Sequence, residues 1–321
     1  MILVTGATGT IGRHLVRALA EAEVPFRALV RDTSQGKELD CEFVVGDFDD
    51  PASMMSALKG VDRLLLNSGG ALPVAGQQPM VRQQMSAIDA ARAAEVSWVV
   101  KVSAGQPSPD AKLSVRAHWE IEQHLKASGL RWASLQPTGY MQNFFTGEGG
   151  FTHSSALEGP YGTGRVAYID AYDIAACAAV LLTRPPGSGE TYALTGPEAL
   201  THEEIAAKLD IPFRDLTPQE AAEGLRAQGL PGWFVDDLLR LYAAMAAGAM
   251  SEVTTAVRDL TGRAPRTFDE FIGERVGPAR QAVDRTRPRA SRGPGLAGQT
   301  GGNRGCLSTR PPARKELPAA R

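Results

Sequence analysis

Apolar and polar positions follow two alternating patterns along the first half of the chain, and these patterns predict strands and helices in turn. Short continuous apolar runs predict strands at residues 1–5, 26–30, 43–45, 61–66, 98–103 and 130–135. Apolar residues three and four positions apart predict helices at 11–22, 51–58, 81–94 and 115–127. Apolar strands that alternate with amphipathic helices are typical of a parallel sheet covered on both faces. We therefore predict an α/β fold of the Rossmann type, with a doubly wound parallel sheet.

The second half of the chain has a looser pattern, which predicts a smaller and mostly helical C-terminal domain that caps a substrate. Helices are expected at 171–182, 201–209, 218–228, 233–247 and 252–260. Two short strands are expected at 166–169 and 191–194, so the sheet is partly shared between the two halves. The domain boundaries that we predict are 1–150, 151–274 and a disordered tail at 275–321.

Charge separates the tail from the rest of the chain. Residues 277–321 hold nine Arg and one Lys against one Asp and one Glu, a net charge of +8, so the rest carries −10 of the total of −2. This tail has seven Gly, six Pro and few large apolar residues, a composition that cannot bury enough surface to fold. The acidic body argues against a nucleic-acid partner for the folded part.

Composition also limits the location and the chemistry. No run of about 18 apolar residues is present, so we expect no membrane span. Met1 leads straight into the first strand without a signal peptide, which predicts a cytoplasmic protein. The three cysteines and five histidines show no ligand spacing, so we expect no metal.

Three glycines after the first strand carry the strongest chemical signal. Gly6 permits a tight turn, Gly9 lets the backbone approach a pyrophosphate, and Gly12 lets the following helix pack closely on the strand. The N-terminus of that helix then faces the phosphates. The alternative is a loop that needs glycine only for packing. The contacts that we predict for a dinucleotide in this turn are Gly6, Thr8, Gly9, Thr10, Ile11 and Gly12.

Arg31, at the end of the second strand, decides which dinucleotide we expect. An acidic residue at this position accepts a hydrogen bond from the ribose 2′-hydroxyl of NAD. The guanidinium of Arg31 can instead bind a 2′-phosphate and stack on adenine. We therefore expect NADP(H) rather than NAD(H). The alternative is that Arg31 is solvated and that Asp32 binds the ribose.

Polar residues after the next two strands extend the predicted cofactor site. Asp47 follows the third strand and can accept from the adenine amino group, whereas Asp49 or Asp50 can equally cap the next helix. Asn67 and Ser68 follow the fourth strand, where the loop would pass the nicotinamide ribose. Such small polar residues are also ordinary in loops.

Several further motifs make the sequence resemble a known family. They lie at residues 5–12, 46–47, 102–104, 118–122, 135–144, 168–170 and 260–268. Together they resemble the NmrA-like family of atypical short-chain dehydrogenase/reductases over about residues 1–274. The resemblance implies an NADP(H)-binding Rossmann domain with a small domain over the nicotinamide. Family members include quinone, azo and benzylic-ether reductases and also redox sensors. The short segment at 209–212 and the basic tail depart from the family.

The tyrosines exclude the usual acid–base pair of short-chain dehydrogenases, in which a Lys four residues after a Tyr lowers the pKa of the phenol. None of the six tyrosines has a lysine at that distance. The resemblance places a catalytic Lys or His at the position of His118. An imidazole there can donate a proton to the acceptor. The alternative is a structural histidine bonded to Glu122, one turn further on.

Residues at the ends of the fifth and sixth strands complete the predicted site. Ser103 lies at the carboxyl edge of the sheet, where ligands bind in such folds, and it either orients the acceptor or caps a turn. Lys101 points to the same face as Ser103, and we expect it to be structural or to lie beside the cofactor. Pro137 should meet the nicotinamide. We expect the acceptor to contact Tyr140, Met141, Asn143 and Phe144. The alternative is that these residues pack in the core.

These residues together predict an NADPH-dependent oxidoreductase that transfers a hydride to a small aromatic or conjugated acceptor, such as a quinone, azo compound or enone. The alternative is an NADP(H)-binding redox sensor without catalysis. We expect a monomer or homodimer with neither a membrane nor a nucleic-acid partner.

Overall fold

A seven-stranded parallel sheet forms the centre of the structure, a computed structural model that describes residues 1–146 and 156–274. Its strands are β1 (Ile2–Val4), β2 (Phe26–Val30), β3 (Phe43–Val45), β4 (Arg63–Leu66), β5 (Trp98–Val102), β6 (Trp132–Pro137) and β9 (Glu190–Leu194). They lie in the order β3-β2-β1-β4-β5-β6-β9, and every neighbouring pair is parallel. The predicted doubly wound Rossmann-type sheet is confirmed. The strand order reverses between β1 and β4, which is where such sheets bind ligands.

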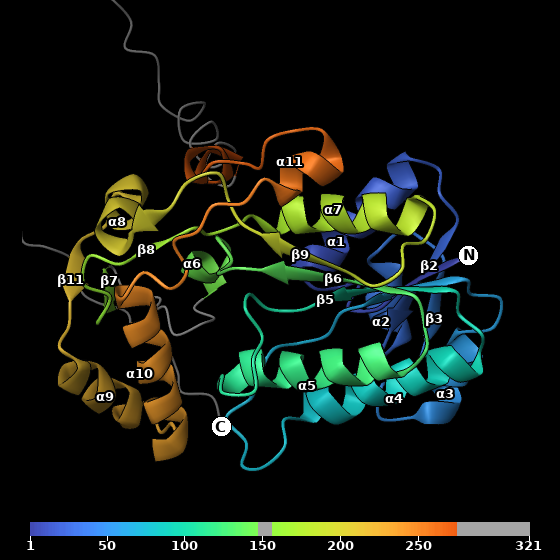
Figure 1. Ribbon diagram of the computed structural model, residues 1–321, viewed down its shortest axis with the longest axis horizontal. Coiled ribbons are helices and arrows are strands. Elements are labelled where there is room, and N and C mark those ends of the chain that lie inside the picture. Colours follow the sequence, from blue (N-terminus) through green and yellow to red (C-terminus); the bar gives the residue numbers. More distant parts are fainter. Residues whose placement is uncertain (147–155, 275–321) are drawn as a thin grey trace, which may run out of the picture. The chain divides into compact units, whose positions relative to one another are not determined.

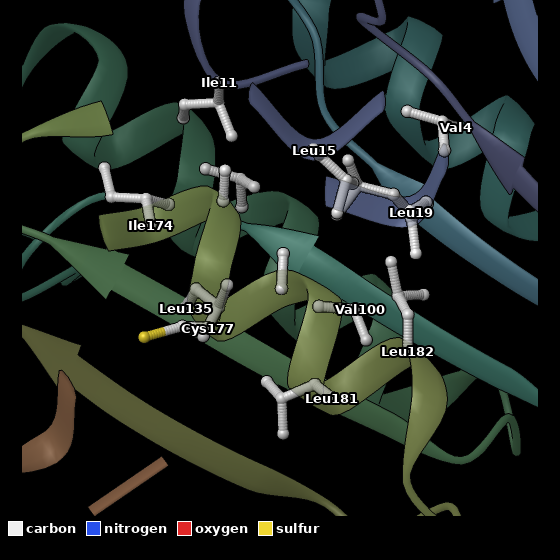
Figure 2. Packing of buried hydrophobic residues seen from close by; sticks show 14 of the residues in the cluster. Val4, Ile11, Leu15, Leu19, Val100, Leu135, Ile174, Cys177, Leu181 and Leu182 are labelled. Atoms are coloured by element: carbon white, nitrogen blue, oxygen red, sulfur yellow. The ribbon is translucent and has the colours of Figure 1, made fainter. Parts of the chain in front are cut away.

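Helices cover both faces of this sheet (Figure 1). One face carries α1 (Thr10–Glu21), α7 (Ala171–Thr183) and α11 (Ala256–Thr261), and the other carries α3 (Pro51–Ala57), α4 (Pro79–Ala93) and α5 (Leu113–Ala127). Successive strand residues point to opposite faces, so Val100 packs toward α1 and α7 while Val99 packs toward α4 and α5. Figure 2 shows the core on the side of α1 and α7, where Leu15 and Leu19 of α1 and Leu182 of α7 belong to one cluster.

The C-terminal region is mostly helical, as predicted. Its elements are α6 (Asn143–Thr146), β7 (Leu157–Gly159), β8 (Arg165–Val166), β10 (Leu200–Thr201), α8 (His202–Leu209), β11 (Phe213–Asp215), α9 (Pro218–Ala227) and α10 (Gly232–Ala246). The short strands form two small pairs, β10 with β8 and β11 with β7. A separate core joins these elements and includes Tyr161, Tyr168, Val235, Tyr242 and Phe268.

Several elements differ from the prediction. The strand expected at 166–169 is the shorter β8, which pairs with β10 outside the main sheet, so β9 is the strand of this half that joins the main sheet. The sequence pattern did not predict α6, β7, β10 and β11.

Two other differences have local causes. The helix expected from residue 252 begins at Ala256, because Thr254 is bonded to the end of β9: its amide donates to Thr195 Oγ1 at 2.9 Å and its hydroxyl to the carbonyl of Ala193 at 2.6 Å. The short helix α2 (Thr33–Lys37) was not predicted, since its five residues have no apolar periodicity and it begins with a cap from Asp32.

The described residues all fall within one compact unit, Met1–Pro278. The boundary predicted at residue 150 and the tail predicted at 275–321 lie outside the described residues. No helix in the described ranges is both long and apolar enough to cross a membrane.

Candidate active site

The turn between β1 and α1 needs glycine at two of its three glycine positions. Gly6 has a φ of +64°, in the left-handed region, and a Cβ there would lie 2.9 Å from the carbonyl oxygen of Asn67. A Cβ on Gly12 would lie 2.1 Å from the carbonyl oxygen of Gly6. Gly9 has an ordinary φ of −77°, and the nearest atom to its added Cβ would be the Gly6 oxygen at 3.3 Å. The backbone therefore explains Gly6 and Gly12, whereas Gly9 lies exposed on the open side of the turn.

Helix α1 begins at this turn without a side-chain cap. The first amides of a helix have no acceptor inside the helix, so those of Thr10, Ile11 and Gly12 are available to an anion. Thr10 is exposed, but the side chain of Ile11 packs in the core, so only the amide of Ile11 can contribute. The carbonyl of Thr8 accepts from Arg13 Nε at 2.9 Å, which ties the turn to the helix. The arrangement fits a pyrophosphate.

Thr5 contributes to the turn and was missed in the sequence. Its buried hydroxyl accepts from the amide of Asn67 at 2.8 Å and lies 2.8 Å from the carbonyl oxygens of Leu65 and Asn67. These bonds join the ends of β1 and β4 at the point where the strand order reverses. A hydroxyl residue that closes an otherwise apolar strand was the available signal.

Arg31 and Asp32 have different surroundings at the end of β2. The guanidinium of Arg31 is exposed and has no hydrogen bond or ion pair with any described residue. Asp32 already accepts from the amide of Gln35 at 3.0 Å and from the hydroxyl of Ser34, and thereby caps α2. The side chain that remains available to a ribose phosphate is therefore that of Arg31.

The carboxylates of Asp47 and Asp50, which follow β3, make different hydrogen bonds. Asp50 caps α3 by accepting from the amides of Ala52 and Ser53. Asp47 is partly buried, and its Oδ1 accepts from the amide of Asp49 at 2.9 Å. The cap expected from Asp49 or Asp50 is thus made by Asp50.

Lys101 is the fourth of the five residues of β5 and has 0% of its surface exposed. Its Nζ is 2.9 Å from Gln84 Oε1, 3.1 Å from the carbonyl oxygen of Val102 and 3.0 Å from His118 Nδ1. Burial lowers the pKa of Lys101 to about 7, although the negative charge of Glu122 acts in the opposite direction. The amine therefore changes protonation near neutral pH.

His118 is held by this lysine rather than by the carboxylate considered from the sequence. Burial lowers the pKa of His118 well below its usual value of 6.5, and the positive charge of Lys101 lowers it further. Glu122 instead accepts from Ser134 Oγ at 2.6 Å and from Gln136 Nε2 at 2.9 Å. The imidazole is thus neutral at physiological pH.

Gln84 connects Lys101 to the loop after β4. Its Nε2 donates to Ser68 Oγ at 2.7 Å, and Ser68 donates in turn to the carbonyl of Gly69 at 3.2 Å. Gln84 is completely buried on α4 and was missed in the sequence, although its position between Val81 and Ile88 on the apolar face of that helix was a signal. The predicted site residues Ser68, Lys101 and His118 therefore belong to one network.

Ser103 follows the last residue of β5, and Pro137 ends the neighbouring strand β6, both at the carboxyl edge of the sheet. The Oγ of Ser103 is buried and has no hydrogen-bond partner among the described residues. Leaving a buried hydroxyl unpaired costs about 1–3 kcal/mol, so the expected partner is a water molecule or a ligand group. Gly105, two residues after Ser103, packs against the end of β6, because a Cβ on Gly105 would lie 3.2 Å from the carbonyl oxygen of Pro137.

The four residues predicted to line an acceptor site differ in burial. Met141 is 1% exposed and packs in the C-terminal core, as the alternative expected. Tyr140, Asn143 and Phe144 are partly buried, and the Phe144 ring lies edge-on to Tyr168 with 4.8 Å between centroids. Within the described ranges, no group of three or more His, Cys, Asp or Glu residues is placed to hold a metal ion.

Comparisons with known proteins agree with the fold. The sequence model of the NmrA-like family matches residues 1–210 of this chain. An NAD(P)H azoreductase of Xenophilus azovorans is 35% identical over 282 residues, which cover 84% of this chain and 96% of the relative. The structure of an NADPH-dependent quinone oxidoreductase from Escherichia coli complexed with NADPH is 27% identical, with a TM-score of 0.74 over 85% of this chain and 99% of that chain. A Citrobacter triphenylmethane reductase, 24% identical, shares the fold with a TM-score of 0.73 over 85% of this chain and 99% of that chain.

A parallel sheet with a glycine turn ahead of an uncapped helix defines the Rossmann class of dinucleotide-binding proteins. Within that class, the chain belongs to the NmrA-like family. The resemblance identified from the sequence motifs is confirmed.

Proposed function

We propose that the protein is an NADPH-dependent reductase of a small aromatic or conjugated acceptor, such as a quinone, an azo compound or an enone. The observation that carries the proposal is the contact between buried Lys101 and His118. Burying the amine of Lys101 costs stability, and groups with strongly shifted pKa values, as Lys101 and His118 have, cluster at sites of chemistry. A protein that only senses the cofactor has no need of them. The names of an azoreductase and a quinone oxidoreductase among its relatives support the same class of acceptor.

The chain offers partners for each part of the cofactor. The glycine turn and the first amides of α1 would hold the pyrophosphate, and Arg31 would hold the 2′-phosphate. The residues that would border the remainder are Asp47, Asn67, Ser68 and Pro137. Lys101 was also expected beside the cofactor, but it has no exposed surface and would act only from behind, through Gln84 and Ser68. Bound NADPH supplies a hydride to the acceptor.

Other side chains act on the acceptor itself. The unpaired hydroxyl of Ser103 would orient it by a hydrogen bond, and Nε2 of His118 would donate a proton to it. Tyr140, Asn143 and Phe144 would border the acceptor, and fixed orientation would lower much of the barrier.

The direct test measures NADPH oxidation by the purified protein with menadione, an azo dye and an enone, each offered separately. The proposal predicts turnover with at least one of the three classes. Tight NADPH binding without turnover of any acceptor would contradict it and would favour the sensor.

Replacing Arg31 by alanine tests the preference for NADPH. Loss of a charged bond to the 2′-phosphate is expected to raise the Kd for NADPH about tenfold, or about 1.4 kcal/mol, and to leave the Kd for NADH nearly unchanged. Fluorescence titration with both nucleotides measures the two constants. Arg92→Ala, which removes an exposed arginine from α4, is the matched control. Equal weakening of both nucleotides would show that Arg31 does not read the phosphate.

A further inference from the structure

Lys101 is a buried cation whose contacts are all neutral. Gln84 Oε1, the Val102 carbonyl and His118 Nδ1 surround its Nζ at 2.9 to 3.1 Å, and no carboxylate of the described residues forms an ion pair with it. Burying an ammonium group without an ion pair costs several kcal/mol. A hydrocarbon side chain would fill the same space on β5 at lower cost, so the amine itself requires an explanation.

The chemistry of the ammonium group sets the direction of every bond in the network. An ammonium carries three hydrogens and no acceptor, and three acceptors surround this one. Nδ1 of His118 therefore accepts from Lys101, which places the single proton of the neutral ring on Nε2. In the same way, Gln84 must present Oε1 to Lys101 and Nε2 to Ser68.

A neutral imidazole is a very weak acid when it acts alone, because loss of its proton leaves an imidazole anion. The ring becomes an effective donor if Nδ1 takes up a proton while Nε2 releases one. The only group in hydrogen-bond contact with Nδ1 among the described residues is the ammonium of Lys101, at 3.0 Å.

We propose that Lys101 stores the proton that completes the reduction and that His118 relays it to the acceptor. The inference rests on the proposed function. In the step, the Nζ–H bond of Lys101 breaks as Nδ1–H forms on His118. At the same time, Nε2–H breaks as a bond forms to the oxygen or nitrogen that carries the negative charge left by the hydride. Lys101 ends as a neutral amine, His118 as the neutral Nδ1–H tautomer, and the acceptor is fully reduced.

The same path returns the proton between turnovers. Lys101 is completely buried, whereas His118 is partly exposed. In the proposed return step, water protonates Nε2 of this partly exposed residue, and the Nδ1 proton then passes back to Nζ. Lys101 does not touch the acceptor, so it is a positioning residue that acts through His118.

The surroundings of Lys101 give the relay a pH dependence. Helix α5 contributes the titratable His118 and Glu122, while α4 contributes the neutral Gln84 and β6 the neutral Ser134. The pKa of Lys101 is about 7, so its amine carries the proton below that pH and has lost it above that pH. The rate constant kcat/KM is expected to fall as pH rises through about 7.

Nitrogen NMR of the full-length protein labelled at histidine tests the starting state without any turnover. At pH 6, His118 is expected to show a neutral ring with the proton on Nε2, and His118→Gln assigns its signals. In Lys101→Met, which is similar in size but has no donor, the signal is expected to change to a protonated ring or a mixture of tautomers. A wild-type ring with the proton on Nδ1, or identical signals in both proteins, would overturn the inference.

Kinetics of three variants test the transfer itself with NADPH and the best acceptor found. Lys101→Met is expected to lower kcat at least tenfold at pH 6. It is also expected to abolish the decrease in kcat/KM as pH rises through about 7. Lys101→Arg keeps the charge and the donors but does not release a proton, so it is expected to retain the His118 tautomer and still lose the rate. Lys59→Met, at an exposed lysine after α3, is the control and should behave as the wild type.

The outcomes separate the inference from the proposed function. Turnover that is equally fast in wild type, Lys101→Met and Lys101→Arg would overturn the relay and leave the reductase standing. The expected NMR signals without turnover of any acceptor would contradict the reductase, and the proton relay with it, while supporting only the bond that Lys101 donates to His118.

Discussion

His118→Gln is expected to lower kcat for the acceptor about 100-fold, because a positioned acid is worth about 100-fold or more and glutamine cannot relay a proton. The amide oxygen of glutamine can still accept from Lys101, so the buried amine keeps a partner. Affinity for NADPH is expected to change less than about twofold, since the glycine turn and Arg31 lie elsewhere. Steady-state kinetics and a nucleotide titration measure the two effects.

His124→Gln is the control for that result. His124 lies on the same helix, α5, and its Nε2 is 2.9 Å from the exposed carboxylate of Asp89. Its replacement should leave kcat unchanged. If His118→Gln behaved like this control, His118 would have no part in proton transfer.

Gly12→Ala is expected to lower the free energy of unfolding by about 3 kcal/mol, because its Cβ would lie 2.1 Å from the carbonyl oxygen of Gly6 and 2.6 Å from Cα of Ala7. These are backbone atoms of the turn, so relief requires that α1 move away from β1. The affinity for NADPH is expected to decrease as well, because the turn is displaced. Urea unfolding followed by a titration at low temperature measures both effects.

Gly9→Ala separates binding from folding in the same turn. Its Cβ would meet only the Gly6 oxygen, at 3.3 Å, and its φ of −77° suits alanine. Stability should change by less than about 1 kcal/mol, while the Kd for NADPH should rise about tenfold because the methyl group stands where the pyrophosphate would approach. Unchanged affinity would show that no pyrophosphate approaches the turn at Gly9.

The sheet and its helices were predictable because their burial is uniform. All five residues of β5 are buried, as expected of a strand covered on both faces, and α1 buries Ile11, Leu15 and Leu19 at helical spacing. The glycine turn was predictable for a different reason, since the left-handed φ of Gly6 and the contact of Gly12 with the Gly6 carbonyl oxygen both arise within residues 6–12. The crowding of Gly6 by Asn67, 61 residues further on, was not predictable in this way.

The network around Lys101 was not predictable in the same way. His118 and Gln84 each lie 17 residues from Lys101, on two different helices. Their contact depends on how α4 and α5 pack against β5, which neither apolar spacing nor local motif determines. A lysine inside an apolar strand indicated that a special environment was needed, without identifying its partners.

Calorimetric titration of the purified protein with NADPH and with NADH measures whether a dinucleotide binds at the β1–α1 turn and whether NADPH is preferred. Saturable binding of NADPH is expected, with binding of NADH at least about tenfold weaker. Absence of binding by either nucleotide would contradict both the site and the reductase built on it.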